Sequence, residues 1–284
     1  MIPDELKGAI HDNVRAALAE DIGSGDLTAD LIDNDAVNGA TIIAREACIV
    51  CGQHWVDEVY RQLDDSIIVD WYIADGEHAE ADDIICKLVG PTRPIVSGER
   101  AALNFLQTLS ATATRTRRYV DAIAGTATRV LDTRKTLPGL RLAQKHAVRC
   151  GGGHNHRTGL YDAILIKENH VRSAGSVAAA LERAQTAHPD VPVQIEVESI
   201  DELHEALDAG AGRILLDNFS IDAVARAVEI NEGYGIVGAE LEVSGNVTLD
   251  NVRAYAETGV DYLSIGALTK HIEAIDLSML LRIS

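Results

Sequence analysis

Hydrophobic and polar residues alternate with two different periods along the first third of the chain. Apolar side chains recur at helical spacing over residues 5–21 and 54–63, whereas residues 41–50, 67–74 and 83–90 are rich in β-branched and aromatic side chains. A 3.6-residue period favours an amphipathic helix, and compact β-rich runs favour strands. The pattern therefore predicts a mixed α/β unit with two helices and three strands.

A third helix is predicted where this first unit ends. Ser97 is placed to cap a helix that starts near Glu99, and the apolar residues that follow recur on one face. These residues are Leu103, Leu106 and Leu109. The helix is expected to connect the first unit to the rest of the chain.

Strands and helices alternate regularly after about residue 112. The candidate strands are residues 128–132, 163–167, 193–197, 213–217, 239–243 and 261–265, and the candidate helices include 176–187, 199–210, 220–230 and 248–259. Ser199 and Glu202 form a potential capping box for the second of these helices. Strands joined by helical crossovers run parallel, and the missing Rossmann glycine pattern favours a closed or nearly closed α/β barrel over a doubly wound open sheet. We predict one α/β domain over residues 1–111 and an α/β-barrel domain over 112–284.

Polar residues stand at the C-terminal end of each candidate strand. They are Asp132 to Lys135, Lys167, Glu196, Asp217, Ser244 and Gly266. Asp and Ser are common helix caps, but six such positions in register exceed what capping requires. Because the C-terminal strand ends form the catalytic face of an α/β barrel, we expect these residues to converge on one site.

The charge of the chain is unevenly distributed. Its formal net charge is −19, yet residues 100–172 hold 13 of the 25 Lys and Arg residues and only 4 of the 44 Asp and Glu residues. A local excess of cations in an acidic chain indicates an anionic ligand. The overall acidity argues against general binding to nucleic acid or to an anionic membrane, and it suits a protein that must stay soluble in concentrated salt.

Membrane-spanning and signal segments bear on the cellular location, and the cysteines bear on possible redox or metal sites. No apolar run is long enough to span a bilayer, and the N-terminal residues lack the pattern of a signal peptide, so we expect a cytoplasmic protein. Cys48 and Cys51 form a C-x-x-C in an apolar run, which favours buried structural thiols over a redox pair or half a metal site. Cys150, His154 and His156 have zinc-like spacing, but the arginines beside them argue against a metal there.

Four cations are candidates for holding the anion. Arg134, Lys135, Arg157 and Lys167 can together bind several negative oxygens, because guanidinium groups suit carboxylate or phosphate edges and lysine supplies compact charge. Lys167 follows an apolar strand and is expected near the barrel interior. The glycines at 151–153 would let the backbone pass close to a ligand.

Two loops and two carboxylates complete the candidate site. Residues 244–246 and 265–267 follow the last two strands, where α/β barrels usually bind phosphate. Glu196 and Asp217 lie on neighbouring strands, and Glu198 can share the face of Glu196. Such carboxylates bind Mg²⁺, accept hydrogen bonds from sugar hydroxyls or stabilise an oxocarbenium ion, unless they only balance the lysine charges.

Seven segments of the chain resemble the quinolinate phosphoribosyltransferase family. They are EDIGSGDLT, GERAALNFLQ, DTRKTLPGLR, KHAVRCGGGHNHRTGLYDAILIKENH, IEVE, LLDNF and LSIGALTKHIEAIDLS, and they extend from about residue 20 to the end. The resemblance implies an N-terminal α/β sandwich domain followed by an incomplete parallel α/β barrel. It also implies a head-to-tail homodimer with shared active sites, and it leaves a higher oligomer open.

The resemblance also implies roles for individual residues. Arg100 would reach the partner's site, and Lys167 would lie between quinolinate and the pyrophosphate of phosphoribosyl pyrophosphate. Glu196 and Asp217 would bind the ribose hydroxyls and Mg²⁺. Quinolinate would contact Arg134, Lys135, His156 and Arg157, and Thr133 would also bind substrate. The 5-phosphate would contact Ser244, Gly245, Asn246, Ile265, Gly266 and Ala267. The chain departs from the family pattern at SATAT and at SGN, and neither departure removes a charged ligand.

The implied reaction joins the quinolinate ring nitrogen to the ribose, expels pyrophosphate and releases CO₂, giving nicotinate mononucleotide for NAD biosynthesis. Two alternatives stay open. A Schiff-base lyase would use Lys135 or Lys167 at a strand end. A related protein of different specificity would bind a phosphorylated ligand without consuming quinolinate.

Overall fold

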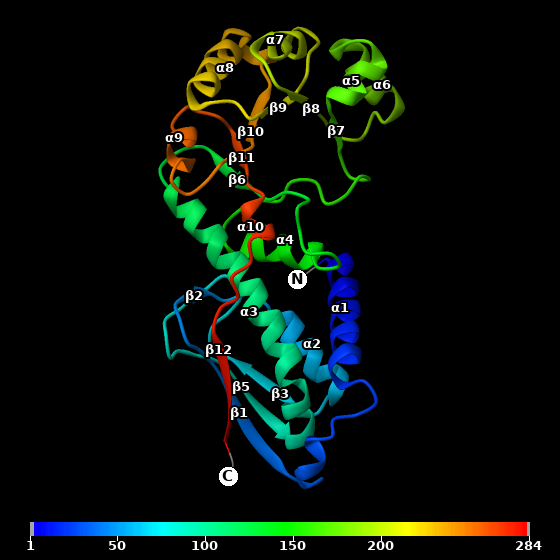
Figure 1. Ribbon diagram of the computed structural model, residues 1–284, viewed down its shortest axis with the longest axis vertical. Helices are drawn as coiled ribbons and strands as arrows, with labels where there is room; N and C mark the ends of the chain where they lie inside the picture. The colour runs from blue at the N-terminus through cyan, green and yellow to red at the C-terminus, as the bar shows by residue number, and fades with distance from the viewer. Residues whose placement is uncertain (1–2, 283–284) are drawn as a thin grey trace. The chain divides into compact units, whose positions relative to one another are not determined.

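The computed structural model describes residues 3–282 and divides them into two compact units (Figure 1). The N-terminal unit comprises the chain up to Arg117, residues 136–152 and the chain from Leu268 onward. The barrel unit comprises residues 118–135 and 153–267. The N-terminal unit therefore includes three stretches that lie beyond residue 111 in the sequence, namely 112–117, 136–152 and the chain from Leu268 onward.

The sheet of the N-terminal unit is antiparallel and has the strand order β12-β1-β5-β3. Its strands are β1 (Val37–Ala44), β3 (Ile68–Trp71), β5 (Ile84–Pro91) and β12 (Leu277–Arg282). The single strand predicted over 41–50 is wrong, because the chain bends at the exposed residues Arg45 to Ala47. The residues after the bend form β2 (Cys48–Ile49), which pairs with β4 (His78–Ala79).

Two helices of this unit follow the predicted pattern. Helix α1 (Asp4–Ile22) buries one side chain in each turn, and α2 (Gln53–Leu63) buries a more aromatic face. The buried residues are Leu6, Ile10, Val14 and Leu18 in α1 and Trp55, Val56, Val59 and Tyr60 in α2. Both helices are confirmed to within two residues at each end.

Helix α3 (Thr92–Ala122) begins earlier than predicted. Pro94 stands in its first turn, where the missing N–H costs no helical hydrogen bond. Ser97 is therefore inside the helix and does not cap it; its hydroxyl donates to Asp26 Oδ2 at 2.6 Å. The three leucines expected on one face are buried, namely Leu103, Leu106 and Leu109.

The barrel unit contains a six-stranded parallel sheet with the order β6-β11-β10-β9-β8-β7. Its strands are β6 (Arg129–Leu131), β7 (Ile164–Ile166), β8 (Val193–Val197), β9 (Arg213–Asp217), β10 (Glu240–Ser244) and β11 (Tyr262–Ser264). All six coincide with the predicted strands. Within residues 3–282 the edge strands β6 and β7 are not paired with each other, so the predicted incomplete parallel barrel is confirmed.

The helices between these strands are short and mostly capped by serine. They are α5 (Glu168–Ala174), α6 (Val177–Ala187), α7 (Ile200–Asp208), α8 (Ile221–Gly233) and α9 (Val252–Ala256), with a 3₁₀ turn at Gly235–Val237. Ser199 Oγ accepts the backbone N–H of Glu202 at 3.2 Å, as a capping box requires. The Glu202 carboxylate, however, accepts the backbone N–H of Glu198 instead of that of Ser199.

Two further helices border the site segments: α4 (Arg141–Cys150) in the N-terminal unit and α10 (Ala267–Lys270), which begins as β11 ends. A 3₁₀ turn covers Ala29–Leu31. Across residues 3–282, no helix combines the length and the apolar character that crossing a bilayer requires.

Candidate active site

The sheet register of the barrel unit brings the strand ends to one edge. Asp217 lies opposite Ser244, Ser244 lies opposite Ser264, and Ser264 lies opposite Leu131. Residues that follow these four positions therefore leave the sheet at the same level, as the sequence pattern predicted.

Three carboxylates and a lysine gather on one side of this edge. Lys167 Nζ lies 2.6 Å from Glu196 Oε2. Glu196, Glu198 and Asp217 each place an oxygen within 4.8 Å of the other two. Carboxylates this close repel one another unless cations share the space, and oxygen ligands suit a hard divalent ion such as Mg²⁺. The set matches the predicted pair Glu196 and Asp217 and adds Glu198.

The guanidinium groups of Arg134 and Arg157 are near enough for their positive charges to repel each other. Burial lowers the pKa of Arg157, and the nearby positive charge of Arg134 lowers it further. Arg157 Nη1 donates to the carbonyl of Ala163 at 3.1 Å, which fixes the direction of the side chain. A ligand with negative oxygens would relieve the repulsion between the two arginines.

The loop after β11 packs directly on the basic segment after β6. Ile265 donates its backbone N–H to Leu131 O at 2.9 Å. At Gly266 an added Cβ would lie 3.0 Å from Lys135 Cδ and 3.7 Å from Thr133 Oγ1. The absence of a side chain at Gly266 thus allows residues 265–267 to lie beside Thr133 and Lys135.

The loop after β10 is held in an unusual conformation by its neighbour. Gly245 and Asn246 have φ angles of +97° and +55°. Asn218, itself at φ +57°, donates its backbone N–H to Ser244 O at 2.8 Å and accepts from Asn246 Nδ2 at 3.3 Å. Asn218 Nδ2 also donates to Asp217 Oδ2 at 2.7 Å. One asparagine therefore joins the candidate phosphate loop to a candidate metal ligand.

His156 takes part in a buried network inside the barrel unit. Its Nε2 lies 2.9 Å from Gln194 Oε1 and 3.4 Å from Glu242 Oε1. The fully buried Glu242 also accepts from Arg213 Nη2 at 2.7 Å, from Gln194 Nε2 at 2.9 Å and from the Ser264 hydroxyl. Burial raises the pKa of Glu242, but the hydrogen bond and charge of His156, the Ser264 hydroxyl and the charge of Arg213 outweigh it and lower the pKa to about 2.

The segment that carries His156 is anchored at the end of β6. Asp132 is buried and accepts the backbone N–H of His156 at 2.9 Å and Asn155 Nδ2 at 2.6 Å. His156 and Arg157 also line a cavity of about 580 Å³ that extends to Arg213 at the start of β9. These two residues thus border a cavity at the N-terminal ends of β7 to β10.

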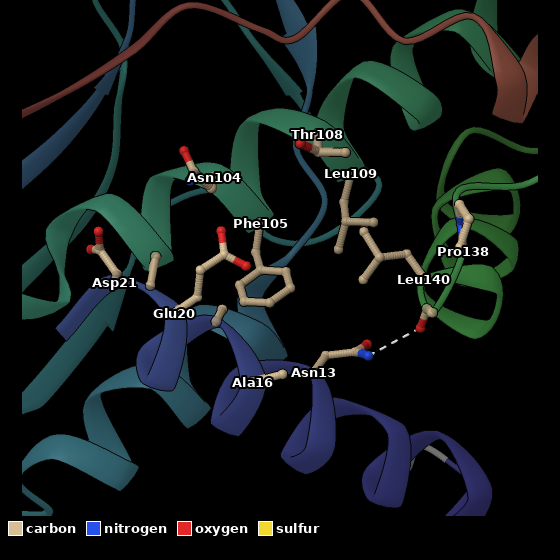
Figure 2. Close-up of a pocket in the computed structure, with 13 residues that line it drawn as sticks. Asn13, Ala16, Glu20, Asp21, Asn104, Phe105, Thr108, Leu109, Pro138 and Leu140 are labelled. Carbon is tan, nitrogen blue, oxygen red and sulfur yellow. Dashed lines mark hydrogen bonds between the residues drawn. The ribbon is translucent and has the colours of Figure 1, made fainter. Parts of the chain in front are cut away.

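Arg100 belongs to the N-terminal unit, apart from the other predicted site residues. It is exposed on α3 and lines a cavity of about 390 Å³ with Asp21, Asp26 and Glu99. A second cavity of this unit, about 400 Å³, lies between α1, α3 and residues 138–140 (Figure 2). Asn13 Nδ2 donates to Gly139 O across its floor, and none of its 13 lining residues is a predicted site residue.

Sequence reasoning missed two residues that organise the site, Asn218 and Glu242. Asn218 follows the strand-end Asp217, and asparagine is one of the few residues that tolerates a left-handed backbone. Glu242 stands between Leu241 and Val243 in the middle of β10, whose other polar residues lie at its two ends. A charge in such a position was the available signal, because it must find buried partners.

Comparison with known proteins covers nearly the whole chain. The family described as "Quinolinate phosphoribosyl transferase, N-terminal domain" matches residues 26–110, and the C-terminal domain of the same family matches residues 112–280. A "Probable nicotinate-nucleotide pyrophosphorylase [carboxylating]" of Bacillus subtilis is 39% identical over 261 residues, which cover 92% of this chain and 89% of that protein.

Two other similar proteins agree with these matches. The "Nicotinate-nucleotide pyrophosphorylase [carboxylating]" of Mycobacterium leprae is 38% identical over 286 residues, covering 98% of this chain and 99% of that protein. The solved structure of the nicotinate-nucleotide pyrophosphorylase from Francisella tularensis superposes with a TM-score of 0.94 and 47% identity, covering 99% of this chain and 98% of that one.

Proposed function

The chain belongs to the quinolinate phosphoribosyltransferase family, from which we infer that it transfers phosphoribosyl from phosphoribosyl pyrophosphate to quinolinate with decarboxylation. It is a pentosyltransferase of NAD biosynthesis, and its products are nicotinate mononucleotide, pyrophosphate and CO₂. The observation that carries the proposal is the charged cluster at the strand-end edge, where Lys167 pairs with Glu196 beside Glu198 and Asp217. Arg134 and Arg157, whose positive charges repel each other, supply a second, cationic group of the barrel unit.

We propose that the cationic group binds quinolinate. The mutual repulsion of Arg134 and Arg157 supports this role, since a dicarboxylate neutralises both. Lys135 adds charge beside Gly266, and His156 is oriented by Gln194 and Glu242. Both substrates are anionic and repel each other in water, so a basic pocket contributes charge neutralisation and proximity together.

The carboxylate group is proposed to bind the ribose and a metal ion. Glu196 and Asp217 accept hydrogen bonds from ribose hydroxyls, and their clustering with Glu198 fits Mg²⁺, which prefers oxygen ligands. When bound, Mg²⁺ would neutralise the pyrophosphate leaving group. Lys167 stands beside Glu196 and contacts the pyrophosphate from the other side. The loops at 244–246 and 265–267 hold the 5-phosphate with backbone N–H groups.

The proposed reaction depends more on the positioning of the two substrates than on acid–base catalysis by side chains. The quinolinate ring nitrogen forms a bond to C1 of the ribose as the bond from C1 to pyrophosphate breaks, and the electron pair leaves with pyrophosphate. The bond to the 2-carboxylate then breaks, and its electron pair remains on C2, stabilised by the adjacent pyridinium. A proton from solvent completes C2, so none of the residues above is required as a general base.

One assay tests this proposal against its alternatives. The purified protein with quinolinate, phosphoribosyl pyrophosphate and Mg²⁺ should release pyrophosphate and CO₂ in equal amounts, and a chelator should abolish turnover reversibly. Ligand binding without quinolinate consumption would instead favour the related protein of different specificity. Trapping of a carbonyl substrate by borohydride would favour a lyase. Full activity in metal-free buffer would contradict the role of Glu196 and Asp217.

We also propose a homodimer in which Arg100 completes the partner's site. Its exposure on α3, within the matched N-terminal domain, supports this role. Arg100→Ala and Lys135→Ala dimers should each be nearly inactive, whereas mixed dimers carry both defects in one site and none in the other. Random mixing makes about half of the dimers mixed, so activity should recover to roughly a quarter of wild type. If the mixture stays inactive although mass labelling shows subunit exchange, Arg100 does not act across the interface.

A further inference from the structure

Four metal-ligating side chains converge in the N-terminal unit, and none of them is assigned to a substrate. Cys51 Sγ, Cys150 Sγ, His146 and Asp75 place their ligand atoms within 4.8 Å of one another. Cys51 precedes α2, Asp75 lies in the turn between β3 and β4, and the other two residues lie on α4. His146 and Cys150 are separated by four positions, so they project from the same face of the helix.

The distances within this cluster correspond to the edges of a small tetrahedron. His146 Nε2 lies 3.1 Å from Asp75 Oδ2 and 3.5 Å from Cys150 Sγ. Tetrahedral zinc, with bonds of about 2.3 Å to sulfur and about 2.0–2.1 Å to nitrogen or oxygen, separates nitrogen from sulfur by about 3.5 Å and nitrogen from oxygen by about 3.3 Å. An ion bound there would therefore require little movement of His146 relative to Asp75 and Cys150.

Asp75 is oriented by a second set of hydrogen bonds. Its Oδ1 accepts the backbone N–H groups of Gly52 at 2.8 Å and Gln53 at 3.1 Å, and its own N–H donates to Gln53 Oε1 at 3.0 Å. Only the second oxygen, Oδ2, is thereby turned toward His146. Outer hydrogen bonds that fix one carboxylate oxygen and leave the other for a ligand are typical of protein metal sites.

We propose that Cys51, Asp75, His146 and Cys150 bind one thiophilic divalent ion, with Zn²⁺ as the best match. Two sulfur ligands disfavour Mg²⁺, and four protein ligands fill the tetrahedral coordination, as in structural zinc sites. Binding requires both cysteines as thiolates and the imidazole as its neutral form, and the protons that these groups lose leave to solvent. The ion would tie together the start of α2, the turn before β4 and the end of α4.

Cys48 and Cys51 are both buried thiols, as the sequence predicted. Cys48 and Cys51 form the C-x-x-C, yet Cys48 is outside the cluster and Cys51 is inside it. Cys150 was weighed with His154 and His156, but among residues 3–282 its potential co-ligands are Cys51, Asp75 and His146. Spacing along the chain could not reveal this grouping, because the four residues come from three separate segments.

The first test uses the reduced, metal-free wild-type protein and Co²⁺ as a spectroscopic probe. One equivalent of Co²⁺ should give a sulfur-to-metal charge-transfer band, which Zn²⁺ abolishes and Mg²⁺ does not. The carboxylates at Glu196 contain no sulfur and cannot produce this band. A protein with four free thiols that gives no such band with Co²⁺ would overturn the proposal.

The second test uses variants with a matched control. Cys51→Ala should weaken Zn²⁺ binding by at least about tenfold, whereas Cys48→Ala removes an equally buried thiol and should leave it unchanged. Asp75→Asn keeps an oxygen that accepts from Gly52 and Gln53 but removes the ligating carboxylate, so it should also weaken Zn²⁺ binding. If Cys51→Ala does not fold, Asp75→Asn tests the site in its place. Equal Zn²⁺ affinity in wild type, Cys51→Ala and Asp75→Asn, measured by competition with a chelating dye, would refute the site.

Discussion

Individual side chains near Arg157 determine whether the site can bind a dicarboxylate. We expect Arg157→Ala and Lys135→Ala each to weaken quinolinate binding by more than about tenfold while the fold persists, because a desolvated carboxylate needs its charge partner. Arg172→Ala removes an exposed arginine of α5 that pairs only loosely with Glu168 at 3.3 Å, and it serves as the control. Titration calorimetry with quinolinate measures the effect, and wild-type affinity in both site variants would exclude this assignment.

Glu242 couples the stability of the barrel unit to pH. Its folded pKa of about 2 lies below the ordinary value of 4.5, so its stabilising contribution is complete above about pH 4.5 and is lost as the pH falls toward 2. A shift of this size corresponds to on the order of 3 kcal/mol. In urea unfolding, the stability advantage of wild type over Glu242→Gln should shrink as the pH falls from about 7 to about 3. A constant advantage would show that Glu242 does not remain ionised for the reasons given.

At the scale of secondary-structure elements, the loop after β10 combines strain with close packing. Gly245→Ala would place a methyl group against the side chain of Asn218 at a positive φ, whereas Gly125→Ala meets the same kind of backbone strain, at φ +84°, with open space around it. Backbone strain should cost both variants about 1 kcal/mol of stability, and Gly245→Ala should lose more because its methyl group also meets Asn218. Only Gly245→Ala should also raise the KM for phosphoribosyl pyrophosphate, and equal kinetics in the two variants would argue against a phosphate-binding role for this loop.

Elements of the barrel unit could be predicted from sequence far better than those of the N-terminal unit. A parallel strand such as 213–217 has an apolar centre, Ile214 to Leu216, and ends in a polar residue, so its place and its functional end are both visible. Helix α3 began seven residues before the expected position because Pro94 is tolerated in a first turn. Strand β12 and the anchor Asn218 escaped prediction because their partners, β1 and Ser244, are distant in sequence.

The whole molecule carries a charge excess that salt should modulate. Outside residues 100–172 there are 40 acidic and 12 basic side chains, so self-repulsion should destabilise the fold at low ionic strength. The thermal midpoint should rise markedly from dilute to molar KCl, and this rise should shrink near pH 4, where many carboxylates are protonated. If the thermal midpoint did not change with KCl concentration at neutral pH, the acidity would serve solubility alone and would not make fold stability depend on salt.

The path of the chain through the two units has a consequence for biosynthesis. Strand β12 supplies one edge of the N-terminal sheet by pairing with β1, from Gly39 with Arg282 to Ala44 with Leu277. A ribosome releases Gly39 long before it has translated Leu277, whereas every strand of the barrel unit has been synthesised by Ser264. The N-terminal sheet, most of which is synthesised first, is therefore completed last. A nascent chain stalled after Ala267 would contain all six strands of the barrel unit, but its N-terminal sheet would still lack the edge strand β12.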